Sequence, residues 1–179
     1  DPYATILQKG NDGSENYEII YISGNFHLGW VFSSGRIGWD TGVAWDLHRW
    51  QRIAVTYRPG AWNFFKNGVL VASRTDVSDT LVTNDVSLWI GNEEPARSRH
   101  FCGEISFILI YCRALTPEEL RHNMMEYHNP VRDGLVLFLY DRIVGDTWHD
   151  ESGHGNDGAI YGAVRKELAM WELRTEVGL

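Results

Sequence analysis

Much of the chain alternates apolar and polar residues with the period of two that is typical of β-strands. Segments 17–23, 26–33 and 50–58 are short, rich in β-branched and aromatic residues, and bounded by glycine, asparagine, aspartate or serine. The third predicts a half-buried antiparallel strand, because its apolar residues share one face. That face is formed by Ile53, Val55 and Tyr57, and the opposite face by Arg52, Ala54 and Thr56.

Residues 61–74 predict a β-hairpin. Asn67 and Gly68 stand between two apolar runs, and this pair of residues favours the two positive φ angles of a type I′ turn. Such a turn would place Phe65 opposite Leu70 on the two strands.

More strands are predicted on both sides of a helix. Segment 103–114 is almost entirely apolar, so we expect a strand that is buried on both faces. The other predicted strands are 86–92, 134–141, 158–164 and 170–177.

The helix is predicted at about 117–128. Thr116 stands at the N-cap, Pro117 at the first helical position and Glu119 at the third, which is the pattern of a capping box. Pro130 ends the pattern. An apolar stripe follows the spacing of a helix and consists of Leu120, Met124 and Tyr127.

Many short strands and one short helix predict an all-β fold, an antiparallel β-sandwich. The 179 residues are enough for one domain with a real core. The aromatic content of 13% is high, which suits pleated strands and also flat surfaces that recognise sugars or proteins.

The charge of the chain limits its partners. The net charge is −8 and the 16 basic residues are scattered, so we expect no nucleic-acid partner and no anionic membrane surface. No apolar run reaches the ~18 residues of a membrane span. Because the chain starts without Met, we expect a processed chain, an expressed fragment or a module cut from a longer polypeptide.

The two cysteines, Cys102 and Cys112, stand at the two ends of the apolar run 103–111. In an extended strand they would lie roughly 33 Å apart. A disulfide needs Cα atoms within ~7 Å, so we expect two free thiols.

Four segments in this order resemble the laminin-G-like, concanavalin-A-like jelly-roll superfamily. They contain TILQKG, WQRIAVTY with the following KNGVLVA, LWIGN, and FCGEISFILIYCRALTPEEL. The match extends over most of 5–128, and it implies a jelly-roll β-sandwich.

The segment GLVLFLYDRIVGDTWHDESGHGNDGAIYGA is similar to the first segment of that family, yet it follows the helix here. One interpretation is a circularly permuted single domain, 1–179, whose first segment is supplied by 131–179. The alternative is the end of one repeat, 1–129, followed by the start of a second, 131–179. The lengths favour permutation, because each piece alone would leave long unpaired strand edges.

The resemblance raises the question of catalysis, because some members of the superfamily hydrolyse glycosidic bonds. That chemistry needs two carboxylates roughly 5–9 Å apart in one cleft. The E-x-D-x-x-E pattern of the hydrolytic branches is absent from the sequence, and the adjacent Glu93 and Glu94 would point apart on an extended chain. We therefore expect that the protein is not an enzyme.

The resemblance also implies a structural calcium ion in the loop DESGHGND, with Asp150 and Asn156 as ligands. Two positions depart from the family pattern, since Ser106 replaces the family aspartate and His154 replaces an asparagine. A glycine-rich turn held by aspartate and asparagine side chains is the alternative.

Sugar recognition combines an exposed aromatic face with a few polar groups, and two loops offer both. Segment 38–50 contains Trp39 and Trp45 beside acidic residues, and segment 92–101 is basic. The candidate ligand-binding residues are Trp39, Asp40, Trp45, Arg97, Arg99 and His100. Packing of both tryptophans in the core remains the alternative.

Together these patterns predict a non-catalytic recognition module, carbohydrate-binding or adhesive, in a larger extracellular or virion-surface protein. Its partner would be a glycan or a protein surface. The alternative is a structural component, such as a shell or spike, whose jelly roll associates with copies of itself as a homo-oligomer.

Overall fold

The structure is a computed structural model, and it describes residues 3–10, 16–93 and 99–166. The strand that the sequence predicts at 170–177 lies outside these residues. Within the described ranges, no helix combines the length and the apolar character that a membrane crossing requires.

The chain forms two compact units, each built from several segments. The first consists of Asp1–Leu47, Arg58–Phe64 and Leu70–Glu104, and the second of His48–Tyr57, Phe65–Val69 and Ile105–Leu179.

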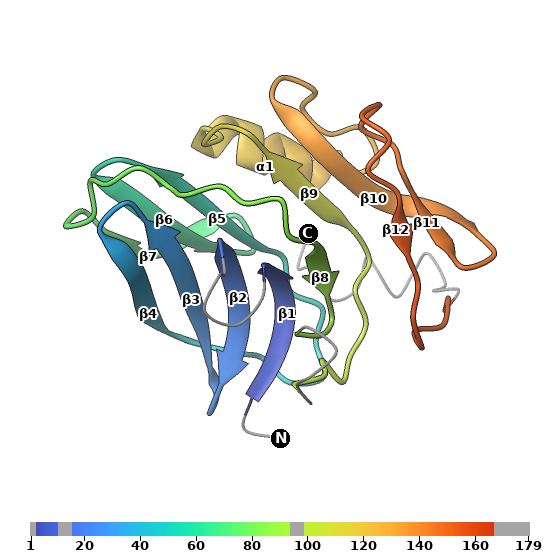
Figure 1. Cartoon of the computed structure of the whole chain (residues 1–179), viewed down its shortest axis with the longest axis horizontal. Helices are drawn as coiled ribbons and strands as arrows, with labels where there is room; N and C mark the ends of the chain where they lie inside the picture. The colour runs from blue at the N-terminus through green and yellow to red at the C-terminus, as the bar shows by residue number, and fades with distance from the viewer. Residues whose placement is uncertain (1–2, 11–15, 94–98, 167–179) are drawn as a thin grey trace. The chain divides into compact units, whose positions relative to one another are not determined.

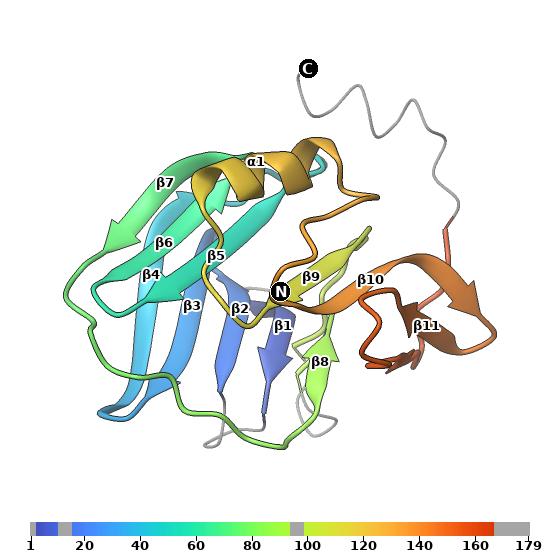
Figure 2. The same ribbon diagram turned by 90° about the horizontal axis from the view of Figure 1, so that it is seen from above.

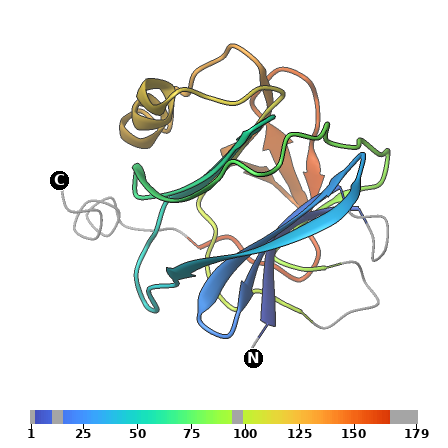
Figure 3. The same ribbon diagram turned by 90° about the vertical axis from the view of Figure 1, so that its left-hand side faces the viewer.

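The first unit contains a five-stranded antiparallel sheet of order β4-β3-β2-β1-β8 (Figure 1). Figure 3 shows the twist of its blue strands. The strands are β1 (Tyr3–Lys9), β2 (Tyr17–Ile22), β3 (Asn25–Phe32), β4 (Gly35–Ala44) and β8 (Leu88–Ile90).

Strand β4 corrects the expectation of a loop at 38–50 for residues 38–44, whereas residues 45–50 lie outside the strands. Gly35 takes a φ of 122° at the start of β4, and the strand runs to Ala44 with an irregularity near Gly42, whose φ is 67°. Half-buried and exposed residues alternate along it. The polar residues that suggested a loop are the solvent-facing half of this strand, because each side chain of a strand points opposite to the next.

The core of this unit is aromatic. Phe26, Leu28 and Phe32 are each 0–1% exposed and lie on one face of β3, because they stand two or four residues apart. Their partners include Trp62 and Phe64, both fully buried, on β6 (Ala61–Lys66). The ring centroids of Phe26 and Phe64 are 5.1 Å apart, as close packing of aromatic rings requires.

The predicted hairpin is confirmed at its turn. Asn67 and Gly68 have φ angles of 50° and 78°. Strands β5 (Ile53–Arg58), β6 and β7 (Val69–Arg74) form a three-stranded sheet in that order. Thr56, expected on the outward face of β5, is instead buried, so the face that carries it is also covered.

The second unit contains a four-stranded antiparallel sheet of order β12-β11-β10-β9, three of whose strands are labelled in Figure 2. Its strands are β9 (Ile108–Tyr111), β10 (Leu135–Val144), β11 (Thr147–Asp150) and β12 (Gly158–Ala159). Strand β10, which the sequence places at 134–141, pairs with β9 from the preceding part of the chain. This pairing is what a permuted domain needs, and permutation itself stays a prediction.

Strand β9 is shorter and more exposed than the apolar run 103–114 predicts. It covers four residues, of which only Ile108 is fully buried. The reason is its position at the edge of the described sheet, where it pairs with β10 on one side and pairing is limited to Ile108–Tyr111. Cys102 and Cys112 are free thiols, as predicted, and both are exposed.

Helix α1 (Pro117–Met125) begins as predicted. The Thr116 side chain accepts a hydrogen bond from the backbone N–H of Glu119, and the Glu119 side chain accepts one from the N–H of Thr116. Leu120 and Met124 are only half-buried, whereas the buried residue of the helix is Asn123.

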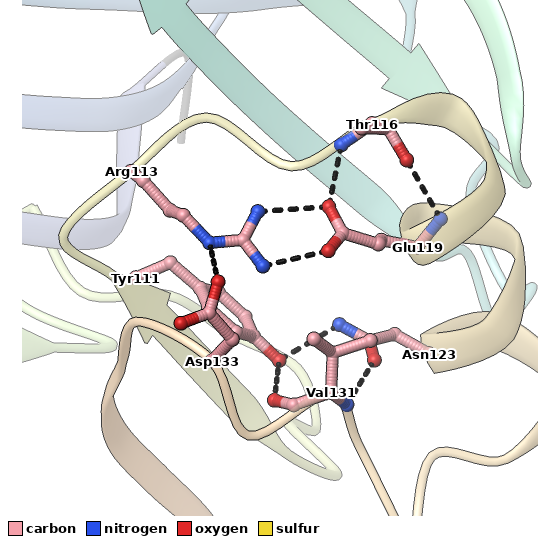
Figure 4. A network of polar contacts seen from close by, with 7 residues as sticks. All are labelled: Tyr111, Arg113, Thr116, Glu119, Asn123, Val131 and Asp133. Carbon is pink, nitrogen blue, oxygen red and sulfur yellow. Dashed lines mark hydrogen bonds and ion pairs between the residues drawn. The ribbon is translucent and has the colours of Figure 1, made fainter.

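A polar network explains why an asparagine is buried on this helix (Figure 4). The Asn123 side chain donates to the hydroxyl of Tyr111 and accepts from the N–H of Val131. Arg113 donates two hydrogen bonds, of 2.8 and 2.6 Å, to the carboxylate of Glu119. The network therefore attaches both ends of α1 to the segments that connect it with β9 and β10.

Candidate functional site

The two faces of the five-stranded sheet differ in chemistry. Directly paired residues share a face, so Trp39 lies on the aromatic core face beside its partner Leu28. The next pair along, His27 and Asp40, lies on the opposite, outer face. The exposed residues of β4 on this outer face include Arg36, Gly38 and Asp40.

Two glycines form the middle of this outer face. Gly29 of β3 and Gly38 of β4 are paired directly, so no side chain rises from either position. A Cβ atom at Gly38 would meet only Nη1 of Arg36, at 3.8 Å. A glycine inside a strand often marks a place where a ligand or another chain approaches the backbone closely.

An ion pair crosses β3 at the first of these glycines. Glu18 of β2 and Arg36 of β4 meet above Gly29, where a Cβ atom would lie 2.6 Å from Nη2 of Arg36. The side chain of Glu18 is 4% exposed and that of Arg36 is 47% exposed. The carboxylate is therefore a fixed, buried partner, and the guanidinium presents its free edge to solvent.

A second polar group lies on the other side of the glycine pair. Oδ1 of Asp40 is 3.5 Å from Nε2 of His27 and accepts hydrogen bonds from Nδ2 of Asn25 and the N–H of Gly42, at 3.3 and 2.9 Å. Asp40 is thus held in place while its side chain stays 53% exposed.

We call this surface the polar strip. Its members are Glu18, His27, Gly29, Arg36, Gly38 and Asp40. It offers donors and acceptors of both signs on a flat floor of backbone, which suits a ligand that both donates and accepts hydrogen bonds.

A buried polar cluster lies further along the same face of the sheet. Gln8 of β1 is paired with Glu18, is fully buried, and donates through Nε2 to Oε1 of Glu93 at 3.5 Å. Nε of Arg99 lies 3.4 Å from Oε2 of Glu93. Among the described residues, Oε1 of Gln8 has no hydrogen-bond partner.

The two candidate tryptophans are packed against the core. The indole of Trp39 meets Trp62 edge to face at 5.3 Å. Trp45 lies 4.9 Å from the ring of Phe26 and 5.6 Å from that of Phe101. Both are half-buried, and Trp39 points away from its sequence neighbour Asp40, so the structure does not bring these two side chains together.

The basic candidates that the structure describes, Arg99 and His100, are not part of the polar strip. Arg97 lies outside the described residues. Arg99 is held by Glu93, and its guanidinium lies 5.2 Å from the ring centroid of Tyr3. His100 is exposed. Of the predicted ligand-binding residues that the structure describes, Asp40 alone is placed on the polar strip.

The loop that resembles a calcium site is held by its own side chains. The Asp150 carboxylate accepts hydrogen bonds from the N–H groups of Phe138, Ser152 and Asn156 and from the Ser152 hydroxyl. Burial alone would raise the pKa of Asp150, but these hydrogen bonds outweigh it and lower the pKa. Nδ2 of Asn156 donates to the carbonyl of Val136.

Cation binding at this loop would have to displace those donors, because they occupy both carboxylate oxygens of Asp150. In the part of the chain that the structure describes, no three His, Cys, Asp or Glu side chains gather as a metal ion would need.

Sequence reasoning missed most of the polar strip, although a local signal was present. The sequence contains Leu28-Gly29-Trp30 and Ile37-Gly38-Trp39, in which a glycine separates two apolar residues. If both are strands with their apolar residues inward, both glycines must face outward. The pairing of the two glycines depends on strand register, which the sequence pattern alone leaves open.

Comparison with known families is consistent with this architecture. A laminin G family profile, described as the concanavalin A-like lectin/glucanases superfamily, matches residues 1–121. No curated protein matches the sequence significantly.

Two solved structures are similar to the chain. A candidate carbohydrate binding protein from Bacteroides ovatus has a TM-score of 0.68 and 18% identity, over 88% of this chain and 47% of that one. An S-layer domain-containing protein from Clostridium thermocellum has a TM-score of 0.37 and 20% identity, over 68% of this chain and 63% of that one. The chain therefore spans about half of the first protein and less than two thirds of the second.

Proposed function

Because the chain belongs to the concanavalin A-like lectin/glucanase superfamily, we propose that it is a non-catalytic carbohydrate-recognition module. We place it in a larger protein that is exposed outside the cell or on a virion. The similarity in fold to a candidate carbohydrate binding protein supports the carbohydrate-recognition part of this proposal.

The polar strip is the observation that carries the proposal. Sugar hydroxyls both donate and accept hydrogen bonds, and they are best recognised by polar groups that are held in place before binding. Arg36 is held by Glu18, and Asp40 by Asn25 and the N–H of Gly42. The backbone at Gly38, which carries no side chain, lies between them and lets a flat ligand approach the sheet.

The carboxylates of this face do not suit glycoside hydrolysis. Hydrolysis uses one carboxyl group as a proton donor and a second as base or nucleophile, both in contact with the substrate. Glu18 and Glu93 are buried, with side chains 4% and 2% exposed, and each is paired with an arginine. Asp40 is the one exposed carboxylate among the members of the polar strip, so these members form no pair of accessible carboxyl groups.

A glycan array tests the proposal. We expect the labelled protein to bind at least one glycan on an array that includes neutral and acidic oligosaccharides. Incubation of the bound glycan with the protein should release no new reducing ends. Cleavage would make the protein a glycanase, and absence of binding across the array would contradict carbohydrate recognition.

A second candidate function, self-association, is favoured by strand β7. Val69, Leu70 and Val71 are consecutive and 62, 50 and 42% exposed, and β7 is an edge of its sheet. An exposed apolar edge strand is a ready surface for another strand. Sedimentation velocity over a range of concentrations tests this function, and Leu70→Lys should abolish any dimer.

Calcium binding by the Asp150 and Asn156 loop stays a prediction. If calcium stabilises the fold, the melting temperature should rise with added CaCl2 and fall with EDTA. Equal melting temperatures would mean that the hydrogen bonds to Asp150 are sufficient to hold the loop.

A further inference from the structure

We infer that the polar strip selects an uncharged glycan, which lies over Gly38 and places hydroxyl groups against Arg36 and Asp40. This inference rests on the proposed function and names the class of ligand. It follows from the charges and the free space of the strip.

The positive charge of the strip is compensated within the protein, and one exposed carboxylate remains. Arg36 is the cation of the strip, and it is already paired with Glu18. Asp40 adds a carboxylate that is 53% exposed, beside His27. A sulfate or a uronic acid would meet a paired guanidinium and a nearby carboxylate of the same sign, on a chain whose net charge is −8. A neutral hydroxyl can accept from the guanidinium edge and donate to the carboxylate without this repulsion.

The free space lies above Gly38. Gly38 is exposed and its φ is not positive, so this position can accept any β-strand residue without backbone strain. Glycine costs stability inside a strand, because the residue loses more conformational freedom on folding and packs no side chain. The absence of a side chain at this position therefore favours access to the floor of the strip.

Gly38→Val separates binding from folding. Its side chain would project over the floor, while a Cβ atom there meets nothing nearer than 3.8 Å, so the variant should fold as stably as the parent. Binding should weaken about tenfold or more, because the ligand can no longer reach the backbone. Ser73→Val is the matched control, because it adds the same side chain at an exposed position of β7.

A second variant tests the guanidinium itself. Arg36→Lys keeps the positive charge beside Glu18 but removes the planar fork of donors, so binding should weaken several-fold. Arg142→Lys is the control, because Arg142 is an exposed arginine on β10.

Native affinity electrophoresis provides the measurement. Gels are cast with a neutral β-glucan, mannan or xylan, or with an acidic polygalacturonate or heparin, and run with the full chain and its variants. We expect a neutral polymer to retard the protein. The apparent affinity should change by less than about twofold when salt rises from 0.05 to 0.5 M, because salt does not screen the interaction with an uncharged ligand. Both strip variants should lose retardation, and both controls should keep it.

The outcomes distinguish the two proposals. Retardation by acidic polymers alone, lost at high salt, overturns the inference and leaves carbohydrate recognition standing. So does neutral binding that survives Gly38→Val. If the parent protein is retarded by none of the polymers, the proposed function fails and the inference fails with it.

Discussion

At Gly29, a hydrogen atom in place of a side chain leaves the space in which Glu18 and Arg36 meet above β3. Gly38, its direct partner, has open space around it instead. Two glycines at the same level of the sheet therefore have different roles, one making room for an ion pair and the other leaving the floor free.

Alanine at the two positions should show this difference. Gly29→Ala should lower the free energy of unfolding by about 1–3 kcal/mol, because the new methyl group displaces a nearly buried carboxylate from its partner. Gly38→Ala should be neutral or slightly stabilising, because it only reduces the freedom of the unfolded chain. Urea unfolding of both variants measures these free energies. Equal losses in the two variants would mean that the ion pair does not need the space left by the missing side chain of Gly29.

At the scale of elements, the turn between β6 and β7 depends on backbone geometry. Gly68 has a φ of 78°, and a Cβ atom there would lie 2.8 Å from Sδ of Met124. Gly68→Val should therefore lower the unfolding free energy by about 1 kcal/mol or more, because a β-branched residue resists positive φ. Val69→Thr, at an exposed neighbouring site, should change it by less than about 0.5 kcal/mol. Thermal melts that show no difference between the two would contradict the turn.

Helix α1 should make stability depend on acid pH. Hydrogen bonds from Arg113, and then from the N–H of Thr116, lower the pKa of Glu119 from 4.5 to about 2. A carboxyl whose pKa is lower in the folded state stabilises the protein above its unfolded pKa, and this contribution is lost as the pH falls. Melting temperatures should therefore fall between pH 4.5 and 2, and less steeply in Glu119→Gln, which keeps the capping group. Glu118→Gln is the control, and equal slopes in the two variants would exclude this role of Glu119.

At the scale of the whole molecule, the segment after α1 supplies β10, which among the described strands is the one that pairs with β9. The pairing follows the order that a permuted domain requires. A tandem arrangement of partial repeats would instead make residues 1–129 independent of this strand.

Deletion of residues 131–179 distinguishes these arrangements. A permuted domain should lose cooperative unfolding or aggregate, because β9 would keep an unpaired edge and the apolar side chains of β10 would be missing from the core of their unit. Circular dichroism melts and size-exclusion chromatography provide the readout. A soluble truncated chain with an unchanged melting transition would favour two partial repeats.

Local patterns in the sequence determined most of the elements. Period-two alternation located β2 and β3, the Asn67-Gly68 pair located a hairpin, and Thr116 with Glu119 located the start of α1. Each of these signals acts within a few residues of backbone, so no distant partner is needed to interpret it. Four family motifs in the right order predicted the superfamily, because members of a family share the order and spacing of their strands and turns.

Only the tertiary structure decided which side chains share a surface. Trp39 and Asp40 are neighbours in sequence but lie on opposite faces, whereas Glu18 and Arg36 come from different strands and meet over Gly29. Strand register determines which side chains meet. A shift of one residue would move every side chain of a strand to the opposite face of the sheet. The sequence by itself therefore determined most of the strands, the hairpin turn and the family. Strand pairing decided where fixed polar groups gather on one surface, because pairing joins residues that the chain keeps far apart.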